Sequence, residues 1–293
     1  MSNVTLHSPL KTKTSLKRLW DKLFQGLGIV CILLTMGVLI TLLFDIFRTG
    51  FDRISWDFIT GHASRKAELA GLLPALVGTT WMMLLTGVLA VPTGIAAAIY
   101  LEEYGNNNRF ASFLEINLSN LAGVPSVIYG ILGLQIFVRL MHLGASFLAA
   151  ALTLSLLILP TLIVTTREAL RAVPSTIREA SYALGASRWQ TIFHQVLPQA
   201  AGGILTGIIL ALSRAIGETA PLIVLGAKVF VSLPHSLSDP YTVLPLQLYN
   251  WISRPEKAFA VNASATIILF LLITFAMNAV AIYLRNRWQK KRL

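Results

Sequence analysis

The chain alternates between long apolar stretches and shorter polar segments that carry most of its charge. A helix needs about 20 mostly apolar residues to cross the hydrocarbon core of a bilayer. Six stretches meet this requirement: residues 25–47, 74–100, 118–138, 147–166, 201–226 and 261–284. The pattern predicts an all-α polytopic membrane protein with six transmembrane helices.

The same pattern divides the chain into segments. Residues 1–24 are predicted to form a cytoplasmic arm, residues 25–47 the first transmembrane helix, and residues 285–293 a basic tail. Residues 74–284 are predicted to form one core of five helices, because helices in lipid associate through small side chains. Two small-residue patterns, Ser126 with Gly130 and Gly203 with Gly207, would supply such faces.

Composition supports the class of membrane protein, and the distribution of charge predicts its orientation in the membrane. Hydrophobic residues make up 55% of the 293 positions and charged residues 13%, against about 25% charged in soluble domains. Of the 24 Lys and Arg residues, fifteen fall on the side that holds both termini and eight on the other. Positive charge collects on the cytoplasmic side, so both termini are predicted there. The net charge of +11 therefore follows from topology, and no nucleic acid is expected as a partner.

Other classes of site lack support in the sequence. The single cysteine, Cys31, excludes a disulfide framework and a thiolate metal cluster. The five histidines have no ligand spacing, and we find no pairing of a nucleophile with a base. We therefore expect no metal, no cofactor and no enzymatic activity.

The polar segment 174–198, between the fourth and fifth stretches, carries helix signals. Thr176 with Glu179, and Ser187 with Gln190, have the spacing of capping boxes. Gly185 lies where a helix end favours a positive φ. We predict two short helices around Gly185, the first exposing the small residues Ala180 and Ala183 to an approaching surface.

This segment resembles the coupling loop of bacterial ABC-importer permeases. In that family Glu-Ala-Ala-x-x-x-Gly is followed, nine residues later, by Ile-x-Leu-Pro; here residues 179–181 read Glu-Ala-Ser and residues 195–198 read Gln-Val-Leu-Pro. The resemblance implies a type I ABC-importer permease fold and a separate cytoplasmic ATPase. The residues it assigns to ATPase coupling are Glu179, Ala180, Ala183, Gly185, Leu197 and Pro198. The chain has no Gly-x-x-x-x-Gly-Lys-Ser/Thr phosphate loop, so ATP hydrolysis is expected in the partner.

A charge pair interrupts the fifth stretch. Arg214 is predicted near its midpoint, where an arginine costs roughly 2.5–3.5 kcal/mol and must face protein or water. Glu218 would lie one turn further out on the same face. Two interpretations stay open: an ion pair that fixes helix packing, or an anion-binding station in which the guanidinium forks onto two oxygens.

A second resemblance concerns the cargo. Residues 214–221 read Arg-Ala-Ile-Gly-Glu-Thr-Ala-Pro and are similar to phosphate importer permeases of the PstA type, as are residues 74–79, 94–104, 124–133 and 241–251. The resemblance covers about residues 74–287 and implies inorganic phosphate as substrate. The substrate path would include Arg214, Glu218, Ser213, Thr219 and Arg167. It implies a bacterial inner membrane, a second homologous permease subunit, two copies of the ATPase and an extracytoplasmic phosphate-binding protein, besides membrane lipid.

Alternatives remain at this stage. The cargo could be tungstate or molybdate; the chain could also be a proton-coupled carrier with Glu218 as relay, or a purely structural subunit. Arg167 is either a topology anchor paired locally or part of an anion exit, and Glu102 with Glu103 is expected to be a solvated helix end. The outer segment 232–260, with Tyr241, Tyr249 and Trp251, is either an interfacial aromatic belt or a docking surface for a binding protein.

Overall fold

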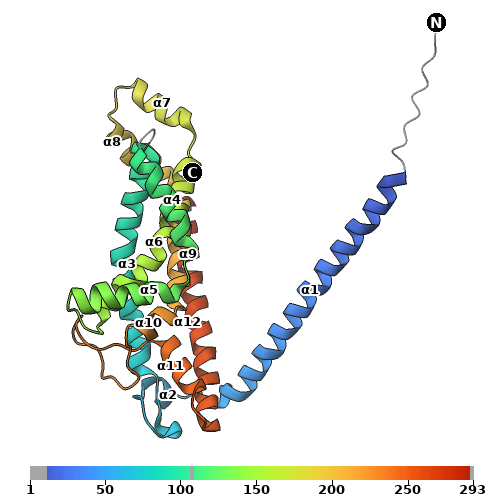
Figure 1. Ribbon diagram of the computed structural model, residues 1–293, viewed down its shortest axis with the longest axis vertical. Helices are drawn as coiled ribbons and strands as arrows, with labels where there is room; N and C mark the ends of the chain where they lie inside the picture. Colours follow the sequence, from blue (N-terminus) through green and yellow to red (C-terminus); the bar gives the residue numbers. More distant parts are fainter. Residues whose placement is uncertain (1–11, 106–108, 291–293) are drawn as a thin grey trace.

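The computed structural model describes residues 12–105 and 109–290, which are almost entirely helical (Figure 1). The helices are α1 (Thr12–Gly50), α2 (Trp56–Thr60), α3 (Leu73–Ile99), α4 (Arg109–Ala122), α5 (Ser126–Gly133), α6 (Phe147–Arg171), α7 (Ser175–Ala183), α8 (Arg188–Thr191), α9 (Leu197–Ile216), α10 (Ala220–Val224), α11 (Leu244–Ile252) and α12 (Lys257–Lys290). Short 3-10 helices lie at Phe51–Arg53 and Ala67–Leu69. π-Helical segments at Tyr100–Tyr104, Leu134–Leu140 and Ile192–Val196 extend or join the helices. Residues 1–11 of the predicted arm and 291–293 of the predicted tail lie outside the described residues, and residues 12–24 belong to α1.

Five continuous helices are long and apolar enough to cross a membrane. They run over Trp20–Arg53, Leu73–Tyr104, Phe147–Arg171, Arg188–Ile216 and Lys257–Arg287. A sixth crossing exists only if α4 and α5, extended to Leu140, count together, because they are bent by 110° at a short break. The all-α fold with membrane-spanning helices is confirmed, but the third predicted span is not one straight helix.

The break between α4 and α5 has a local cause. It falls at residues 123–125, which read Gly-Val-Pro. Pro125 disfavours a helical backbone at the preceding Val124 and cannot donate a backbone hydrogen bond. Leu118 and Val138, the predicted ends of one span, therefore lie in different helical arms.

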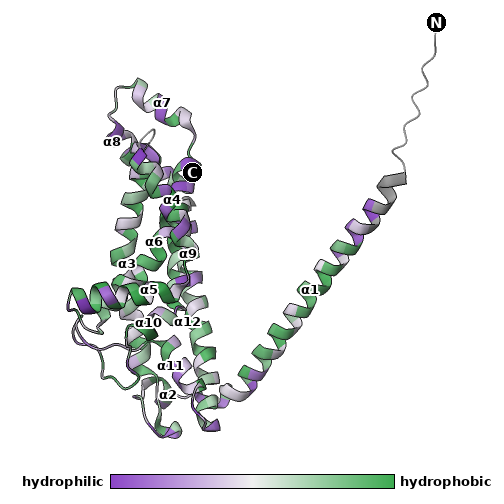
Figure 2. Ribbon diagram, in the orientation of Figure 1, coloured by the Kyte–Doolittle hydropathy of each residue, from purple (hydrophilic) through white to green (hydrophobic). Residues whose placement is uncertain are grey.

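Helix α1 stands apart from the other helices (Figure 1). The most apolar 18 residues of this helix have no buried side chain. Hydrophobic residues cover its middle, and hydrophilic residues lie towards its ends (Figure 2). It packs against α12 towards its C-terminal end, most closely at Gly50: a Cβ there would lie 2.4 Å from the Ala265 backbone nitrogen. Such a helix needs lipid or another protein along its sides.

The bundle is built around α6, in which 67% of the most apolar 18 residues are buried. Glycines let α9 approach α6 closely. A Cβ added to Gly203 would lie 2.6 Å from the Ala169 Cβ, and a Cβ added to Gly207 would lie 2.3 Å from the Thr165 hydroxyl. The predicted Gly203–Gly207 packing face is confirmed. Gly130 of the other predicted pattern meets Pro221 of α10 instead of a long helix.

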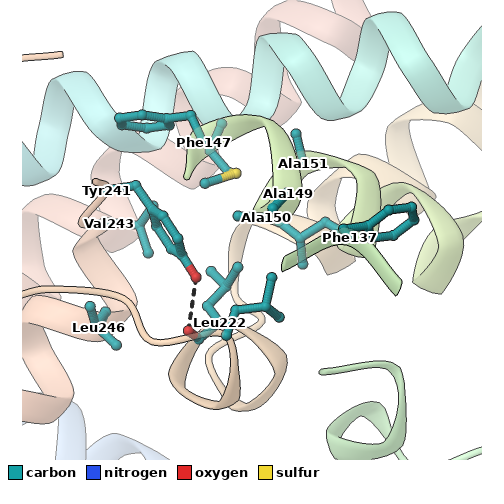
Figure 3. Close-up of a cluster of buried hydrophobic side chains, with 12 residues drawn as sticks. Phe137, Phe147, Ala149, Ala150, Ala151, Leu222, Tyr241, Val243 and Leu246 are labelled. Atoms are coloured by element: carbon teal, nitrogen blue, oxygen red, sulfur yellow. Dashed lines mark hydrogen bonds between the residues drawn. The ribbon is translucent and has the colours of Figure 1, made fainter. Parts of the chain in front are cut away.

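The outer segment between α10 and α11 folds back onto the start of α6. The amides of Phe147 and Leu148 donate hydrogen bonds to the carbonyls of Asp239 and Leu237. The Tyr241 hydroxyl donates to the Leu222 carbonyl at 2.9 Å inside an apolar cluster (Figure 3). Tyr241 and Trp251 are buried and Tyr249 is exposed. The expectation of a surface role is therefore wrong for the first two aromatics, which form core.

Candidate functional site

Arg214 lies in the last turn of a long helix. The helix runs without interruption from Arg188 to Ile216, through α8, a π-helical segment and α9. It ends there because Pro221, four residues after Gly217, cannot donate a backbone hydrogen bond and would clash with the Gly217 carbonyl in a continued helix. The prediction that residues 201–226 form one continuous helix is wrong, since this helix ends at Ile216, two residues after Arg214.

Glu218 lies in the turn that follows α9. Its Oε1 is 3.6 Å from the Arg214 Nε, a long contact for an ion pair. The Arg214 side chain is 45% exposed and that of Glu218 17%. Within residues 12–105 and 109–290, the Arg214 guanidinium has no hydrogen-bond partner. The pair leaves most donors of the guanidinium free for another acceptor.

A second interrupted helix meets this turn. Gly130 of α5 approaches Pro221 so closely that a Cβ there would lie 2.7 Å from the Pro221 Cα. The neighbouring Tyr129 is buried, donates a hydrogen bond to the Leu121 carbonyl across the α4–α5 bend, and packs in one buried cluster with Ala215, the residue after Arg214. Irregular backbone at membrane depth occurs where it is buried in protein or lines a water-filled cavity. Two helix breaks therefore converge beside Arg214.

Sequence reasoning missed Tyr129 as a neighbour of Arg214. The sequence signals near it were the Gly-Val-Pro run at residues 123–125, which predicts a break, and the resemblance over residues 124–133. The residues are 85 positions apart along the chain, so only the fold brings them together.

The two predicted hydroxyls have other partners. Ser213 donates a hydrogen bond to Asn278 Oδ1 at 2.5 Å, so it faces α12. Thr219 donates to the Gly217 carbonyl at 3.4 Å within the turn. The structure brings Arg214 and Glu218 together but directs Ser213 away from them.

An apolar groove of about 340 Å³ lies between α9 and α12. Leucine and isoleucine dominate its lining, which contains neither Arg214 nor Glu218. Its polar lining residues already have protein partners: Asn278 Oδ1 accepts a hydrogen bond from Ser213, and Arg285 donates to Thr206 and Asn286. An anion needs free charged or hydrogen-bonding groups to replace its hydration. This groove therefore does not extend the Arg214 site.

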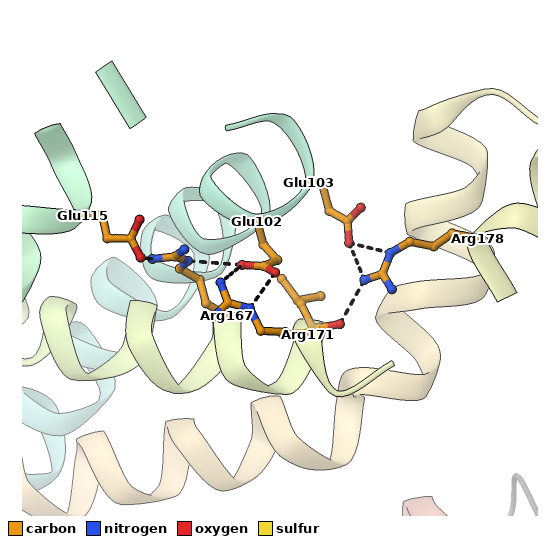
Figure 4. A network of polar contacts seen from close by, with 7 residues as sticks. Glu102, Glu103, Glu115, Arg167, Arg171 and Arg178 are labelled. Atoms are coloured by element: carbon orange, nitrogen blue, oxygen red, sulfur yellow. Dashed lines mark hydrogen bonds and ion pairs between the residues drawn. The ribbon is translucent and has the colours of Figure 1, made fainter. Parts of the chain in front are cut away.

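Arg167 lies near the C-terminal end of α6, where six charged side chains gather (Figure 4). Its Nη1 lies 3.0 Å from Glu115 Oε1 and its Nε 3.4 Å from Glu102 Oε2. We call this group the inner ion-pair cluster; its members are Glu102, Glu103, Glu115, Arg167, Arg171 and Arg178. Arg167 is paired with other helices rather than locally, and it is remote in sequence from the Arg214 turn.

The expectation of a solvated helix end at Glu102 and Glu103 is wrong. A π-helical turn over Tyr100–Tyr104 directs the Glu102 side chain to Arg167 and Arg171 of α6 and the Glu103 side chain to Arg178 of α7. The Glu103 side chain is only 6% exposed. The apolar pattern could not reveal this, because the partners lie on distant segments.

Helix α7 and Gly185 match the predicted coupling segment in part. Gly185 has φ +81°, and Ser187 with Gln190 forms the predicted capping box. The box predicted for Thr176 and Glu179 does not form, because α7 begins earlier, at Ser175 after Pro174. The second helix is not short either, since it continues to Ile216.

The predicted coupling residues separate into two groups. Glu179, Ala180, Ala183 and Gly185 are exposed on the segment, whereas Leu197 and Pro198 are half-buried inside the long helix. Next to the first group, Leu184 is 89% exposed, and the rings of Trp189 and Phe193 pack 4.6 Å apart on the surface. Exposed apolar side chains of this size at a loop tip favour contact with another protein.

Comparisons with known proteins agree with this architecture. Residues 90–290 match the family described as "Binding-protein-dependent transport system inner membrane component". The chain is 32% identical to the phosphate transport system permease protein PstA of Haemophilus influenzae, covering 97% of this chain and 100% of that protein. It is 34% identical to PstA 1 of Mycobacterium tuberculosis, covering 78% of each, and 31% identical to the probable ABC transporter permease protein YqgI of Bacillus subtilis, covering 84% and 83%.

Solved structures show the same fold at low sequence identity. A permease chain of a bacterial alginate ABC transporter superposes with a TM-score of 0.66 and 14% identity, covering 92% of this chain and 99% of that one. A chain of the inward-facing MetNI methionine transporter gives a TM-score of 0.59 and 17% identity, covering 73% and 96%. The type I ABC-importer permease fold is thereby confirmed.

Proposed function

Because the chain belongs to the family of inner-membrane components of binding-protein-dependent transport systems, we propose that it is the permease subunit of an ATP-driven importer of inorganic phosphate. The observation that supports phosphate as the cargo is the Arg214–Glu218 turn. The Arg214 guanidinium there is half exposed, and its Nε lies 3.6 Å from the Glu218 carboxylate. The PstA proteins to which the chain is similar are named as phosphate permeases.

The chemistry of the turn suits hydrogen phosphate. A planar guanidinium donates two parallel hydrogen bonds to two oxygens of a tetrahedral oxyanion. Glu218 accepts a hydrogen bond from the protonated oxygen of hydrogen phosphate. Sulfate and molybdate carry no such proton at neutral pH, so the carboxylate repels them. Without substrate, Glu218 holds Arg214 near its binding position.

The exposed side of the 174–198 segment binds the ATPase. Glu179, Ala180, Ala183 and Gly185 form the contact face, and Leu184 enters an apolar pocket on the partner. Leu197 and Pro198 lie within the long helix that links this segment to Arg214 and ends at Ile216. When two ATPase copies close around bound ATP, they move this segment. The movement changes the side of the membrane from which the Arg214 turn is accessible.

The remaining partners follow from the family and from α1. A second homologous permease subunit completes the translocation path, and an extracytoplasmic phosphate-binding protein delivers the cargo. Lipid or that second subunit covers the exposed sides of α1. The chain lies in the bacterial inner membrane with both ends in the cytoplasm.

The proposal is tested in proteoliposomes that contain this chain, its permease partner, the ATPase and the binding protein. We expect phosphate uptake that requires ATP and is inhibited by arsenate but not by sulfate or molybdate. Uptake without ATP would indicate a secondary carrier. If molybdate inhibits the ATP-dependent uptake and phosphate does not, the chain would still be an importer permease, but its cargo would be another oxyanion.

A further inference from the structure

Helix α7 is anchored through one side only. Its exposed side carries Glu179, Ala180 and Ala183. The other side carries Ile177, Arg178 and Ser181, and each of these contacts the bundle. A movement of α7 is therefore transmitted to the helices that its buried side contacts.

Arg178 joins α7 to two membrane helices at once (Figure 4). Its Nη2 and Nε donate hydrogen bonds to Glu103 Oε1 at 2.8 and 3.2 Å. Its Nη2 and Nη1 also reach the carbonyls of Leu170 and Val173 at 2.9 and 2.8 Å, at the end of α6. The Arg178 side chain is 18% exposed and that of Glu103 6%. Removing one partner of such a pair would leave a buried charge unbalanced.

Ser181 makes the connection to the long helix. Its hydroxyl lies 2.8 Å from the hydroxyl of Thr191, which is fully buried. Helix α7 is also joined to α9 through the continuous backbone, whereas its link to α3 runs through side chains.

Helix α3 leads from Glu103 to the Arg214 turn. Ala90 of α3 packs in one buried cluster with Tyr129 and Ala215, the neighbours of Arg214. Among the described residues, the hydrogen bonds of α7 to α3 and its π-helical extension are those between Arg178 and Glu103. Coupling between sites travels through such contiguous contacts where they have two arrangements.

We propose that the Glu103–Arg178 pair transmits movement of α7 to α3 and thereby couples ATP hydrolysis to opening of the Arg214 site. Both are positioning residues, and neither contacts the cargo. The inference rests on the proposed function, since it requires an ATPase that moves α7. It predicts that weakening the pair separates hydrolysis from transport without preventing assembly.

The test uses the complete transporter in proteoliposomes, with phosphate uptake and ATP hydrolysis measured on the same preparation. The variants are Glu103→Gln and Arg178→Gln. Arg171→Gln is the matched control, because Arg171 also pairs with a glutamate of the π-helical turn, Glu102, but lies on α6 and is 65% exposed.

We expect both pair variants to retain the ATPase and its basal hydrolysis. Phosphate moved per ATP should fall about tenfold, a typical size for coupling between sites. The control should stay within about twofold of the unmodified chain, because exposed ion pairs contribute little. The double variant Glu103→Gln/Arg178→Gln should be no worse than the worse single variant, because both remove one interaction.

Two results would overturn the inference. In the first, Glu103→Gln moves as much phosphate per ATP as Arg171→Gln does. In the second, Glu103→Gln no longer retains the ATPase on purification, which would assign the pair to docking. The unmodified chain tests the proposed function separately: if it shows no ATP-dependent phosphate uptake, both proposals fail, whereas normal uptake with unaffected variants rejects only the coupling pair.

Discussion

Two charged regions of the molecule differ in how completely their charges are satisfied. In the inner ion-pair cluster, Arg178 has a carboxylate and two carbonyls as partners, all within 3.2 Å. At the helix break, Arg214 has one carboxylate at 3.6 Å and remains 45% exposed. Charges that are fully paired hold helices together, whereas a charge left with free donors is available to a ligand. The comparison therefore distinguishes a region whose charges join helices from the region that we propose binds the anion.

The largest effect is expected at Arg214. Replacing it with alanine (Arg214→Ala) removes two charge-assisted hydrogen bonds to the anion, each worth roughly 1.5–3 kcal/mol, so phosphate uptake should fall about a hundredfold or more. Assembly should survive, because the side chain is half exposed. The measurement is uptake per assembled transporter. Normal uptake would remove Arg214 from the substrate path.

Glu218→Gln should change selectivity more than rate. The amide can donate a hydrogen bond to an unprotonated oxygen, so sulfate and molybdate are no longer repelled. We expect their inhibition of phosphate uptake to strengthen about tenfold, the order expected when an unfavourable polar contact is relieved. Competition curves for the variant and the unmodified chain provide the measurement. Unchanged selectivity would limit Glu218 to holding Arg214.

Arg167→Gln tests whether the inner ion-pair cluster is structural. The substitution removes contacts to Glu115 and to the half-buried Glu102, which should lower stability by about 1–3 kcal/mol. A lower melting temperature of the purified complex would show this. Uptake per folded complex should be unchanged. A specific loss of uptake would instead place Arg167 on the anion exit.

The smallest effect is expected at Asp239, whose carboxylate is stabilised by backbone amides rather than by an arginine side chain. Hydrogen bonds from the amides of His235 and Ser236 lower the pKa of Asp239 below its ordinary value. A lowered folded-state pKa adds stability above the unfolded-state pKa, and this stability is lost as the pH falls through the folded-state pKa. Amide protection of these two residues should therefore drop at acid pH. Asp239→Asn should already lack it at neutral pH, whereas pH-independent protection in the unmodified chain would contradict the role.

The two regions were not equally accessible from sequence. Arg214 and Glu218 are four residues apart within an apolar stretch, so their charge alone marked them. The inner ion-pair cluster joins residues from 102 to 178, and two of its glutamates, Glu102 and Glu103, were expected to be solvated. Local spacing cannot show that a π-helical turn and α7 bring Glu103 and Arg178 together.

Helix boundaries show the same limit. Apolar length predicted membrane-spanning helices correctly, because crossing lipid requires about 20 apolar residues whatever the neighbours. It did not predict the 110° bend at residues 123–125 or the end of α9 before Gly217. An apolar sequence satisfies a straight helix and a broken one equally well when protein covers the break.

The sequence by itself determined the all-α membrane class, the Arg214–Glu218 pair, Gly185 with its positive φ and the capping box at Ser187. These depend on composition or on residues within one or two helical turns, where spacing dictates geometry. Only the tertiary structure decided that Tyr129 packs beside Ala215, next to Arg214, that Ser213 faces α12, and that Arg178 binds Glu103 at the end of α3. Those contacts join segments tens of residues apart, and they form only because close helix packing around α6 brings the segments together.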